Sequence, residues 1–249
     1  QVTEINIYPI KSTAKITLPS VEVESTGLQW DRRWMLTDHH FQFITGRKYP
    51  KLTQIYSSLH DSSLRVSFQH ETIEIPFDAQ GKEVVATVWK DAVKSIHLQQ
   101  YDAWFSQWLE QDCHLIYMQN LQSRTTSPHP TMSSALSFAD SSPLLLTNLA
   151  SLHDFRPNIV ISGESAYEED QWKIIQIGSI TFSVISPCRR CVFTTVDPNR
   201  GIKRSDGEPL KTLHTYRQLP NRTGVYFGQN LIPHSLGKIQ LGDHVILHE

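Results

Sequence analysis

Two cysteines lie three positions apart near residue 190, and two arginines separate them. The segment Cys188-Arg-Arg-Cys191 follows a strand-like apolar run at 180–185. A neighbouring guanidinium group stabilises the charged form of a thiol, so Arg189 and Arg190 are expected to favour the thiolate of Cys191. Such a thiolate serves as a nucleophile, as a redox group or as a ligand for a soft metal.

The usual functions of a CxxC pair each carry a sequence requirement. A zinc site needs two further ligands, and the chain has no second CxxC. A thioredoxin-type pair opens a helix in a βαβ unit, whereas residues 192–196 are β-branched and predict a strand. Two inert core cysteines are the third alternative, although the intervening arginines would be costly to bury. The pair by itself leaves a functional thiolate and an inert one both open.

Basic and hydroxyl side chains recur beside the predicted strands. They are Lys11 and Ser12, Arg32 and Arg33, Thr45 and Arg47, Ser141 and Ser142, Arg156 and Asn158, and Arg189 and Arg190. Strand ends can converge on one mouth of a sheet, and guanidinium groups beside hydroxyls are the donors that a phosphate group requires. The pattern therefore favours a phosphate or pyrophosphate site, with solvated surface arginines as the alternative.

Most of the elements that must position these side chains are strands. Alternating or continuous apolar residues predict them at 2–8, 21–24, 34–37, 64–68, 72–76, 84–89, 93–98, 158–162, 174–177, 180–185, 225–229 and 238–247. Helices are predicted at 102–110, with Asp102 as N-cap, and at 147–155 and 209–217. Residues 119–137 are rich in Ser, Thr and Pro and are predicted as a linker. The expected fold class is α+β, mainly β, with barrel-like sheets and a few covering helices.

Composition limits the classes of protein that this chain can represent. Its 249 residues carry a formal net charge of −2, which indicates neither a general nucleic-acid binder nor a membrane-surface binder. No apolar run approaches the roughly 18 residues of a membrane helix, and the first residues do not form a signal peptide. Three cysteines fit a reducing compartment, so a cytoplasmic location is expected. They are also too few for a [2Fe–2S] cluster, so electrons for redox chemistry are expected from outside the chain.

Six motifs in order give the chain a recognisable resemblance. They are Ile7-Tyr-Pro-Ile-Lys-Ser12, Asp31-Arg-Arg-Trp34, Asp140-Ser-Ser-Pro143, Phe155-Arg-Pro-Asn-Ile-Val-Ile161, Pro187-Cys-Arg-Arg-Cys191 and Thr194-Thr-Val-Asp-Pro198. Together they resemble the MOSC proteins, and more narrowly the bacterial YcbX group and the mitochondrial amidoxime-reducing component family. The resemblance runs from about residue 2 to about residue 247.

The resemblance implies a fold, a cofactor and a set of binding residues. An N-terminal MOSC-associated β-rich domain is expected over 1–125 and a MOSC β-barrel domain over 126–249, with a molybdenum cofactor (molybdopterin) held between them. Cys191 would ligate molybdenum, a thiophilic metal, and Cys188 would pack beside it. The remaining cofactor-binding residues would be Lys11, Ser12, Arg32, Ser141, Ser142, Arg156, Asn158, Arg189 and Arg190.

The resemblance also implies an activity and partners. The expected enzyme is a molybdenum-dependent oxidoreductase that reduces small N-hydroxylated substrates, such as amidoximes and N-hydroxylated nucleobases. Electrons would come from a ferredoxin-like protein or a flavoprotein reductase, and neither a membrane nor sequence-specific nucleic-acid binding is expected. Asp197 and His214 are titratable candidates for proton transfer near the motif. The alternatives are a non-catalytic cofactor carrier or sulfur-transfer module, and a metal-free dithiol redox protein.

Overall fold

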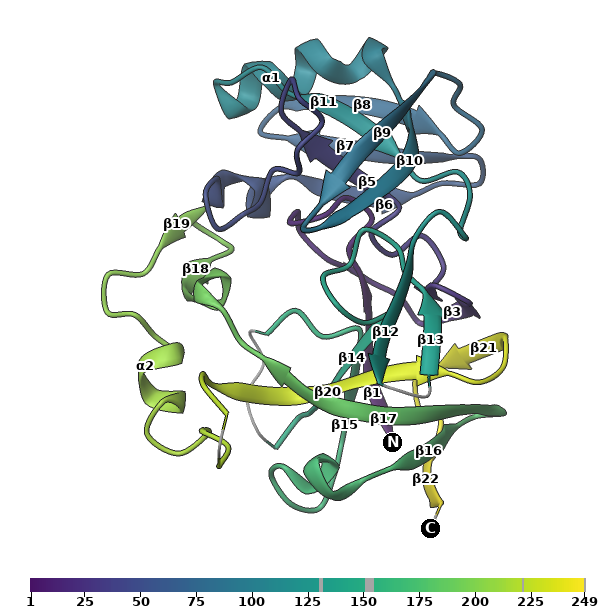
Figure 1. Cartoon of the computed structure of the whole chain (residues 1–249), viewed down its shortest axis with the longest axis vertical. Helices are drawn as coiled ribbons and strands as arrows, with labels where there is room; N and C mark the ends of the chain where they lie inside the picture. Colours follow the sequence, from purple (N-terminus) through teal and green to yellow (C-terminus); the bar gives the residue numbers. More distant parts are fainter. Residues whose placement is uncertain (130–131, 151–154, 221, 249) are drawn as a thin grey trace.

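A computed structural model describes residues 1–129, 132–150, 155–220 and 222–248 of the chain. Strands make up 43% of the residues and helices 12%, which confirms the mainly β fold class. Figure 1 shows two lobes, one above the other, with the small helix α1 at the top of the upper lobe. No helix among the described residues is long and apolar enough to cross a membrane.

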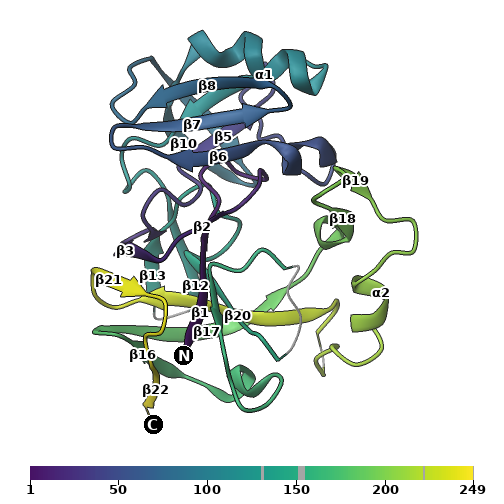
Figure 2. The same ribbon diagram turned by 180° about the vertical axis from the view of Figure 1, so that it is seen from behind.

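The lower lobe is built on an eight-stranded sheet in the order β2-β1-β15-β14-β20-β17-β16-β22. Its strands are β1 (Val2–Ile7), β2 (Ile16–Thr17), β14 (Leu144–Asn148), β15 (Ile159–Ile161), β16 (Ile174–Ile177), β17 (Ile180–Arg189), β20 (Tyr226–Pro233) and β22 (Val245–His248). β1 pairs antiparallel with β15, so the start of the chain lies inside a sheet otherwise made mostly by its second half. Figure 2 shows β1 among these later strands.

A second, three-stranded sheet in the order β21-β3-β4 closes the core of the lower lobe. It consists of β3 (Ser20–Glu24), β4 (Gly27–Leu28) and β21 (Gly237–Gln240). The period-two pattern of β3 buries Val21 and Val23 and leaves Glu22 exposed. These two valines pack in one apolar cluster with Ile5 of β1 and Phe182 of β17, which are far apart in the sequence. Burial of this shared cluster joins the N-terminal strands to the later sheet.

The upper lobe packs a four-stranded sheet and a three-stranded sheet around a second core. The first, in the order β5-β11-β10-β9, contains β5 (Trp34–Thr37), β9 (Lys82–Val88), β10 (Asp91–His97) and β11 (His114–Tyr117); the second contains β6 (Tyr56–Leu59), β7 (Ser63–Phe68) and β8 (Glu71–Pro76). The helix α1 (Asp102–Leu109) covers one side, preceded by the 3-10 turn η2 (Gln99–Tyr101). Trp34, Leu64 and Phe105 are fully buried in this core.

Several predicted elements have the expected type, and three do not. The hairpins β7–β8, β9–β10 and β16–β17 confirm the alternating patterns. The linker prediction is wrong, because residues 119–137 include the paired strands β12 (Thr125–His129) and β13 (Met132–Ala135). The predicted helix at 147–155 is wrong at its start, where Thr147 and Asn148 end the buried strand β14; residues 151–154 lie outside the described part of the chain.

The remaining differences concern short elements around the cysteine motif. Residues 192–196 begin with the 3-10 helix η4 (Val192–Thr195), not a strand, before the two-residue strand β18 (Val196–Asp197) pairs with β19 (Ile202–Lys203). The predicted helix at 209–217 is shorter, since α2 spans only Leu210–Leu213. Both helices are too short to be stable by themselves. Packing stabilises them instead, as the fully buried side chain of Leu213 does for α2.

Candidate functional site

The predicted site residues converge on one pocket. Its walls include all ten of them: Lys11, Ser12, Arg32, Ser141, Ser142, Arg156, Asn158, Arg189, Arg190 and Cys191. Thr45 and Arg47 from the upper lobe also line it, as does Cys188. The exception among the basic clusters is Arg33, which is buried elsewhere and donates from Nε to the carbonyl of Met118 over 3.0 Å.

Cys191 lies at the end of β17, where the sheet gives way to η4. Its side chain is exposed, and its carbonyl accepts the backbone N–H of Thr194 at 3.0 Å and the Thr194 hydroxyl at 2.8 Å. These two bonds fix the turn that follows the thiol. All three cysteines, including the buried Cys113, are free.

The two arginines of the motif do not act on Cys191 in the expected way. The Nη1 atom of Arg190 donates to the sulfur of Cys188 at 3.1 Å, and its Nη2 donates to the carbonyl of Phe155 at 2.7 Å. Arg189 is exposed and passes beside Gly224, where a Cβ would lie 2.7 Å from its Nε. The guanidinium hydrogen bond therefore goes to Cys188, and Cys191 is left as the accessible thiol.

The sheet around the pair differs from that of a thioredoxin-type protein. Cys191 is followed by η4 and not by a strand, so the predicted strand at 192–196, which had spoken against a thioredoxin-type pair, is wrong. However, β17 pairs antiparallel with both β16 and β20, and the cysteines therefore do not belong to a βαβ unit. A metal-ligand or nucleophile role fits this position better than a thioredoxin-type dithiol.

Arg32 and Arg156 form the cationic floor of the pocket by packing on Tyr8. Their guanidinium carbons lie 4.4 Å and 4.0 Å from the centre of the Tyr8 ring. Burial, together with the charge of Arg32, lowers the pKa of Arg156 to about 10. Burial raises the pKa of Tyr8 to about 12, against the opposing effect of Arg156, so Tyr8 is a neutral platform.

Ser12, Arg32 and Arg156 share an uncommon backbone conformation. Their φ values are 72°, 51° and 57°, in the left-handed region that favours glycine. Such residues cost of the order of 1 kcal/mol or more and concentrate at ligand sites. The chain therefore holds three pocket residues in strained conformations that direct their side chains to one place.

Asn158 positions the cationic floor. Its Oδ1 accepts from Arg32 Nη1 at 3.0 Å and from the backbone N–H of Leu145 at 3.1 Å, and its Nδ2 donates to the Asn6 carbonyl at 3.1 Å. Arg32 also pairs with the buried carboxylate of Asp31. Burial raises the pKa of Asp31, although Arg32 and the Tyr8 N–H oppose that effect.

Lys11 is the buried cation on the opposite wall. Its Nζ donates to the Phe138 carbonyl at 2.7 Å and to Asp140 Oδ1 at 2.5 Å. Burial lowers the pKa of Lys11, while Asp140 raises it. Although desolvation opposes it, the pKa of Asp140 lies well below its usual range because Lys11 and Arg47 stabilise the carboxylate.

The sequence patterns did not single out one pocket residue, Asp140, or its hydrogen-bond donor Trp89, which lies outside the pocket lining. Asp140 lines the pocket and accepts from Trp89 Nε1 at 3.2 Å. Trp89 in turn carries the guanidinium of Arg47 over its ring at 4.4 Å. Asp140 could have been found from the sequence, because it begins the motif that also contains Ser141. Trp89 follows a strand of a hairpin, and no sequence pattern marks it as a site residue.

Two buried polar atoms that line the pocket have no hydrogen-bond partner among the described residues. They are the hydroxyl oxygen of Ser142 and Nε of Arg190. Buried polar groups are usually paired, and an unpaired group in a pocket wall indicates a missing ligand. The donor set, with cations, a hydroxyl and one accessible thiol, fits a phosphate-bearing cofactor whose metal is bound by sulfur.

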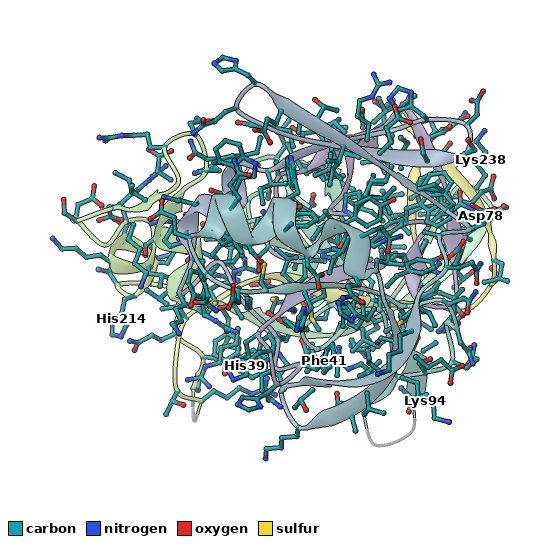
Figure 3. All side chains as sticks on the ribbon, turned by 90° about the horizontal axis from the view of Figure 1, so that it is seen from above. His39, Phe41, Asp78, Lys94, His214 and Lys238 are labelled. Carbon is teal, nitrogen blue, oxygen red and sulfur yellow. The ribbon has the colours of Figure 1, made fainter. Side chains whose placement is uncertain are left out.

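The two titratable candidates for proton transfer lie away from the pocket walls. The Asp197 carboxylate accepts the backbone N–H groups of Asn199 and Arg200 at 3.0 Å and 3.3 Å, as expected for a turn residue. His214 contacts Gln218, and Figure 3 shows it at the edge of the molecule. Neither residue lines the pocket, and the hydrogen bonds given above for each are with residues close to it in the sequence.

Comparison with known proteins identifies the family. The model of the MOSC N-terminal beta barrel domain matches residues 1–112, and the model of the MOSC domain matches residues 131–246. The chain is 30% identical to mitochondrial amidoxime-reducing component 1 of Mus musculus over 99% of this chain and 82% of the relative. The human protein of the same name is 29% identical with the same coverage. The chain belongs to the MOSC-domain family.

A second kind of relative within the MOSC-domain family matches as well. The human molybdenum cofactor sulfurase is 27% identical over 94% of this chain, but the match covers 30% of the sulfurase. Together, these relatives support a role related to the molybdenum cofactor. The domain boundary after residue 125 and the cofactor contacts of the ten site residues stay predictions.

Proposed function

We propose that this MOSC-domain protein is a molybdenum-dependent reductase of N-hydroxylated compounds, such as amidoximes or N-hydroxylated nucleobases. One observation carries the proposal: an exposed, free thiol, Cys191, opens onto a pocket whose walls hold several cations and two unpaired polar atoms. The similarity to amidoxime-reducing components over nearly the whole chain supports this reaction class.

The pocket residues divide into a metal ligand and a phosphate cradle. Cys191 Sγ would ligate molybdenum, because thiolate is a soft ligand. Arg32, Arg156, Lys11 and the hydroxyl of Ser142 would hold the pterin and its phosphate through charge-assisted hydrogen bonds. When bound, the cofactor supplies two-electron chemistry that removes oxygen from an N–OH group.

The remaining residues of the pocket set access and charge. The overall reaction consumes two electrons and two protons, breaks the N–O bond, and releases water and the N–H product. Cys191 and Arg189 are exposed, so the pocket is open to substrate and to solvent protons on the side where these two residues lie. Arg47 and Trp89 lie on the upper-lobe side, near the ion pair between buried Lys11 and exposed Asp140.

Electrons would come from a ferredoxin-like protein or domain, or from a flavoprotein reductase. The three cysteines of the chain cannot complete a four-cysteine iron–sulfur cluster. A cytoplasmic location is proposed because three cysteines fit a reducing compartment.

The decisive experiment measures molybdenum and pterin in protein from a host that makes the cofactor. Wild type is expected to contain both in near-stoichiometric amounts and to reduce benzamidoxime with a chemical electron donor. Cys191→Ser is expected to lose metal and activity, whereas the matched control Cys188→Ser keeps both. Wild-type protein free of molybdenum and pterin would refute the cofactor proposal, and equal loss of activity in both variants of such metal-free protein would support a dithiol function.

The alternative function is a cofactor carrier or sulfur-transfer module, supported by the similarity to the molybdenum cofactor sulfurase. The same experiment separates the two functions. A carrier would contain stoichiometric cofactor but would not reduce benzamidoxime with the chemical donor. Turnover in that assay would favour the reductase.

A further inference from the structure

A cluster of metal-binding side chains lies in the upper lobe and does not belong to the Cys191 pocket. His97 Nε2 and His114 Nδ1 each lie 2.7 Å from the same oxygen, Oδ2 of Asp102. Among the described residues, the ligand atoms of this trio all lie within 4.8 Å of one another. None of the three lines the pocket, so the proposed reductase chemistry does not account for them.

The strand register brings the two histidines together. His97 ends β10 and faces Ile116 on β11, and His114 lies two residues before Ile116 on the same face of that strand. The ring of Phe41 packs against both imidazoles, at centroid distances of 5.5 Å and 5.2 Å. Figure 3 marks Phe41 in the upper lobe seen from above. The two rings are therefore held with one nitrogen each toward the start of α1.

The carboxylate of Asp102 is also held in place. Asp102 was expected to be the N-cap of its helix, but it is the first helical residue, after Tyr101 as N-cap. Its Oδ1 instead accepts the backbone N–H of Leu115 at 3.0 Å. This bond fixes one oxygen on β11 and leaves Oδ2 directed at both imidazoles. A monodentate carboxylate with two imidazoles is a ligand set typical of zinc enzymes and related metal sites.

We propose that His97, Asp102 and His114 form a binding site for a divalent transition metal, with zinc as the best match. Zinc bonds of about 2.0–2.1 Å in a tetrahedron place neighbouring ligand atoms about 3.3 Å apart. The two observed nitrogen–oxygen separations of 2.7 Å need to open by about 0.6 Å to reach this value. In the metal-bound state, the ring nitrogens that face the carboxylate would carry no proton and would bind the ion through their lone pairs.

A fourth ligand is available from solvent. The side chains of His114 and Asp102 are 26% and 17% exposed, whereas His97 is 10% exposed. The site therefore opens on the His114 side, where water can complete the coordination. The bound ion would link β10, β11 and α1, three elements that Figure 1 places together in the upper lobe, and so stabilise that lobe.

The test uses the full chain with both motif thiols replaced, Cys188→Ser and Cys191→Ser, so that zinc cannot bind to that pair. Calorimetric titration with zinc is expected to show one site per chain, and zinc is expected to raise the melting temperature. Each of His97→Gln and His114→Gln is expected to weaken zinc binding by at least about tenfold. The matched control, His39→Gln, removes an exposed histidine that stacks on His40 and is expected to bind zinc as the parent does.

A second measurement does not depend on how the variants fold. Cobalt(II) added to the parent protein is expected to give the intense visible absorption of a four-coordinate ion, which zinc then removes. The proposal is overturned if the parent protein binds no metal, or if the folded histidine variants bind zinc as tightly as the His39→Gln control. In that case the trio is a hydrogen-bond network only. Because this site lacks Cys191, its failure would leave the proposed reductase function untouched.

Discussion

The guanidinium carbon of Arg156 lies 4.0 Å from the centre of the Tyr8 ring, and the Arg156 backbone is left-handed, with φ of 57°. No ion pair with a carboxylate holds this arginine within the described part of the chain. Its charge is stabilised mainly by an aromatic face, and burial lowers its pKa to about 10. The side chain is therefore held at a cost in both backbone conformation and desolvation, as expected for an anion-binding group.

Arg156 gives a prediction that separates stability from binding. Arg156→Gly and Arg156→Ala are both expected to lose pterin content, because each removes the cation. Glycine relieves the left-handed strain and alanine does not, so the glycine variant is expected to be about 1 kcal/mol more stable than the alanine variant. Urea unfolding of the two variants measures the difference. An alanine variant of equal or greater stability would contradict the backbone argument.

The Lys11–Asp140 pair predicts a pH dependence of anion binding. Burial lowers the pKa of Lys11, so this cation loses its proton at a lower pH than an exposed lysine, whose ordinary value is 10.5. Binding of sulfate, measured calorimetrically, is expected to weaken as the pH rises, and this weakening is expected to begin at a lower pH than the ordinary titration of an exposed lysine. Asp140→Asn is expected to shift that loss to lower pH, because the carboxylate raises the pKa of Lys11.

Lys11→Arg is the control for this pH dependence. An arginine keeps its charge through the same range, so sulfate affinity is expected to stay constant in this variant. If the arginine variant shows the same fall as wild type, then another group titrates and Lys11 is not responsible.

Gly46 gives a prediction about the contact between the lobes at the thiol. A Cβ at position 46 would lie 2.2 Å from Cε2 of Phe193, which belongs to η4 directly after Cys191. Gly46→Ala is therefore expected to displace Phe193 and to reduce molybdenum content and activity by about tenfold, which elemental analysis and turnover would measure. The control Gly207→Ala meets nothing within 4 Å and does not line the pocket; its φ of 74° makes alanine cost about 1 kcal/mol of stability, but molybdenum content and activity are expected to stay unchanged.

A loop of the lower lobe makes a second contact with the upper lobe near the 3-10 turn η1 (Pro50–Gln54). Gln54 Nε2 donates to the Asn199 carbonyl at 3.1 Å, and Figure 1 shows β18 and β19 extending upward to this turn. Gln54→Ala is expected to lower cofactor retention less than Gly46→Ala, because it removes one exposed hydrogen bond and creates no clash. An equal or larger loss would mean that this contact, and not Phe193, sets the position of η4.

The sequence by itself determined the local elements and the chemical composition of the site. Period-two patterns predicted the hairpins, because alternate side chains of a strand face one core. The basic and hydroxyl clusters beside the strands predicted a common pocket, and ten of ten predicted site residues line it. The family resemblance supplied that set of ten, whereas residue type and spacing alone also included Arg33, which lies outside the pocket.

Only the tertiary structure decided how neighbouring residues divide their roles. Arg32 enters the pocket while Arg33 turns to Met118, because the left-handed backbone at Arg32 sends the two side chains apart. Arg190 contacts Cys188 and leaves Cys191 exposed, which the spacing alone does not specify. Asp102 caps no helix because two histidines and a backbone N–H, brought by β10 and β11, compete for its carboxylate. These contacts join residues distant in sequence or depend on one dihedral angle, so strand pairing and burial determine them, and local pattern does not.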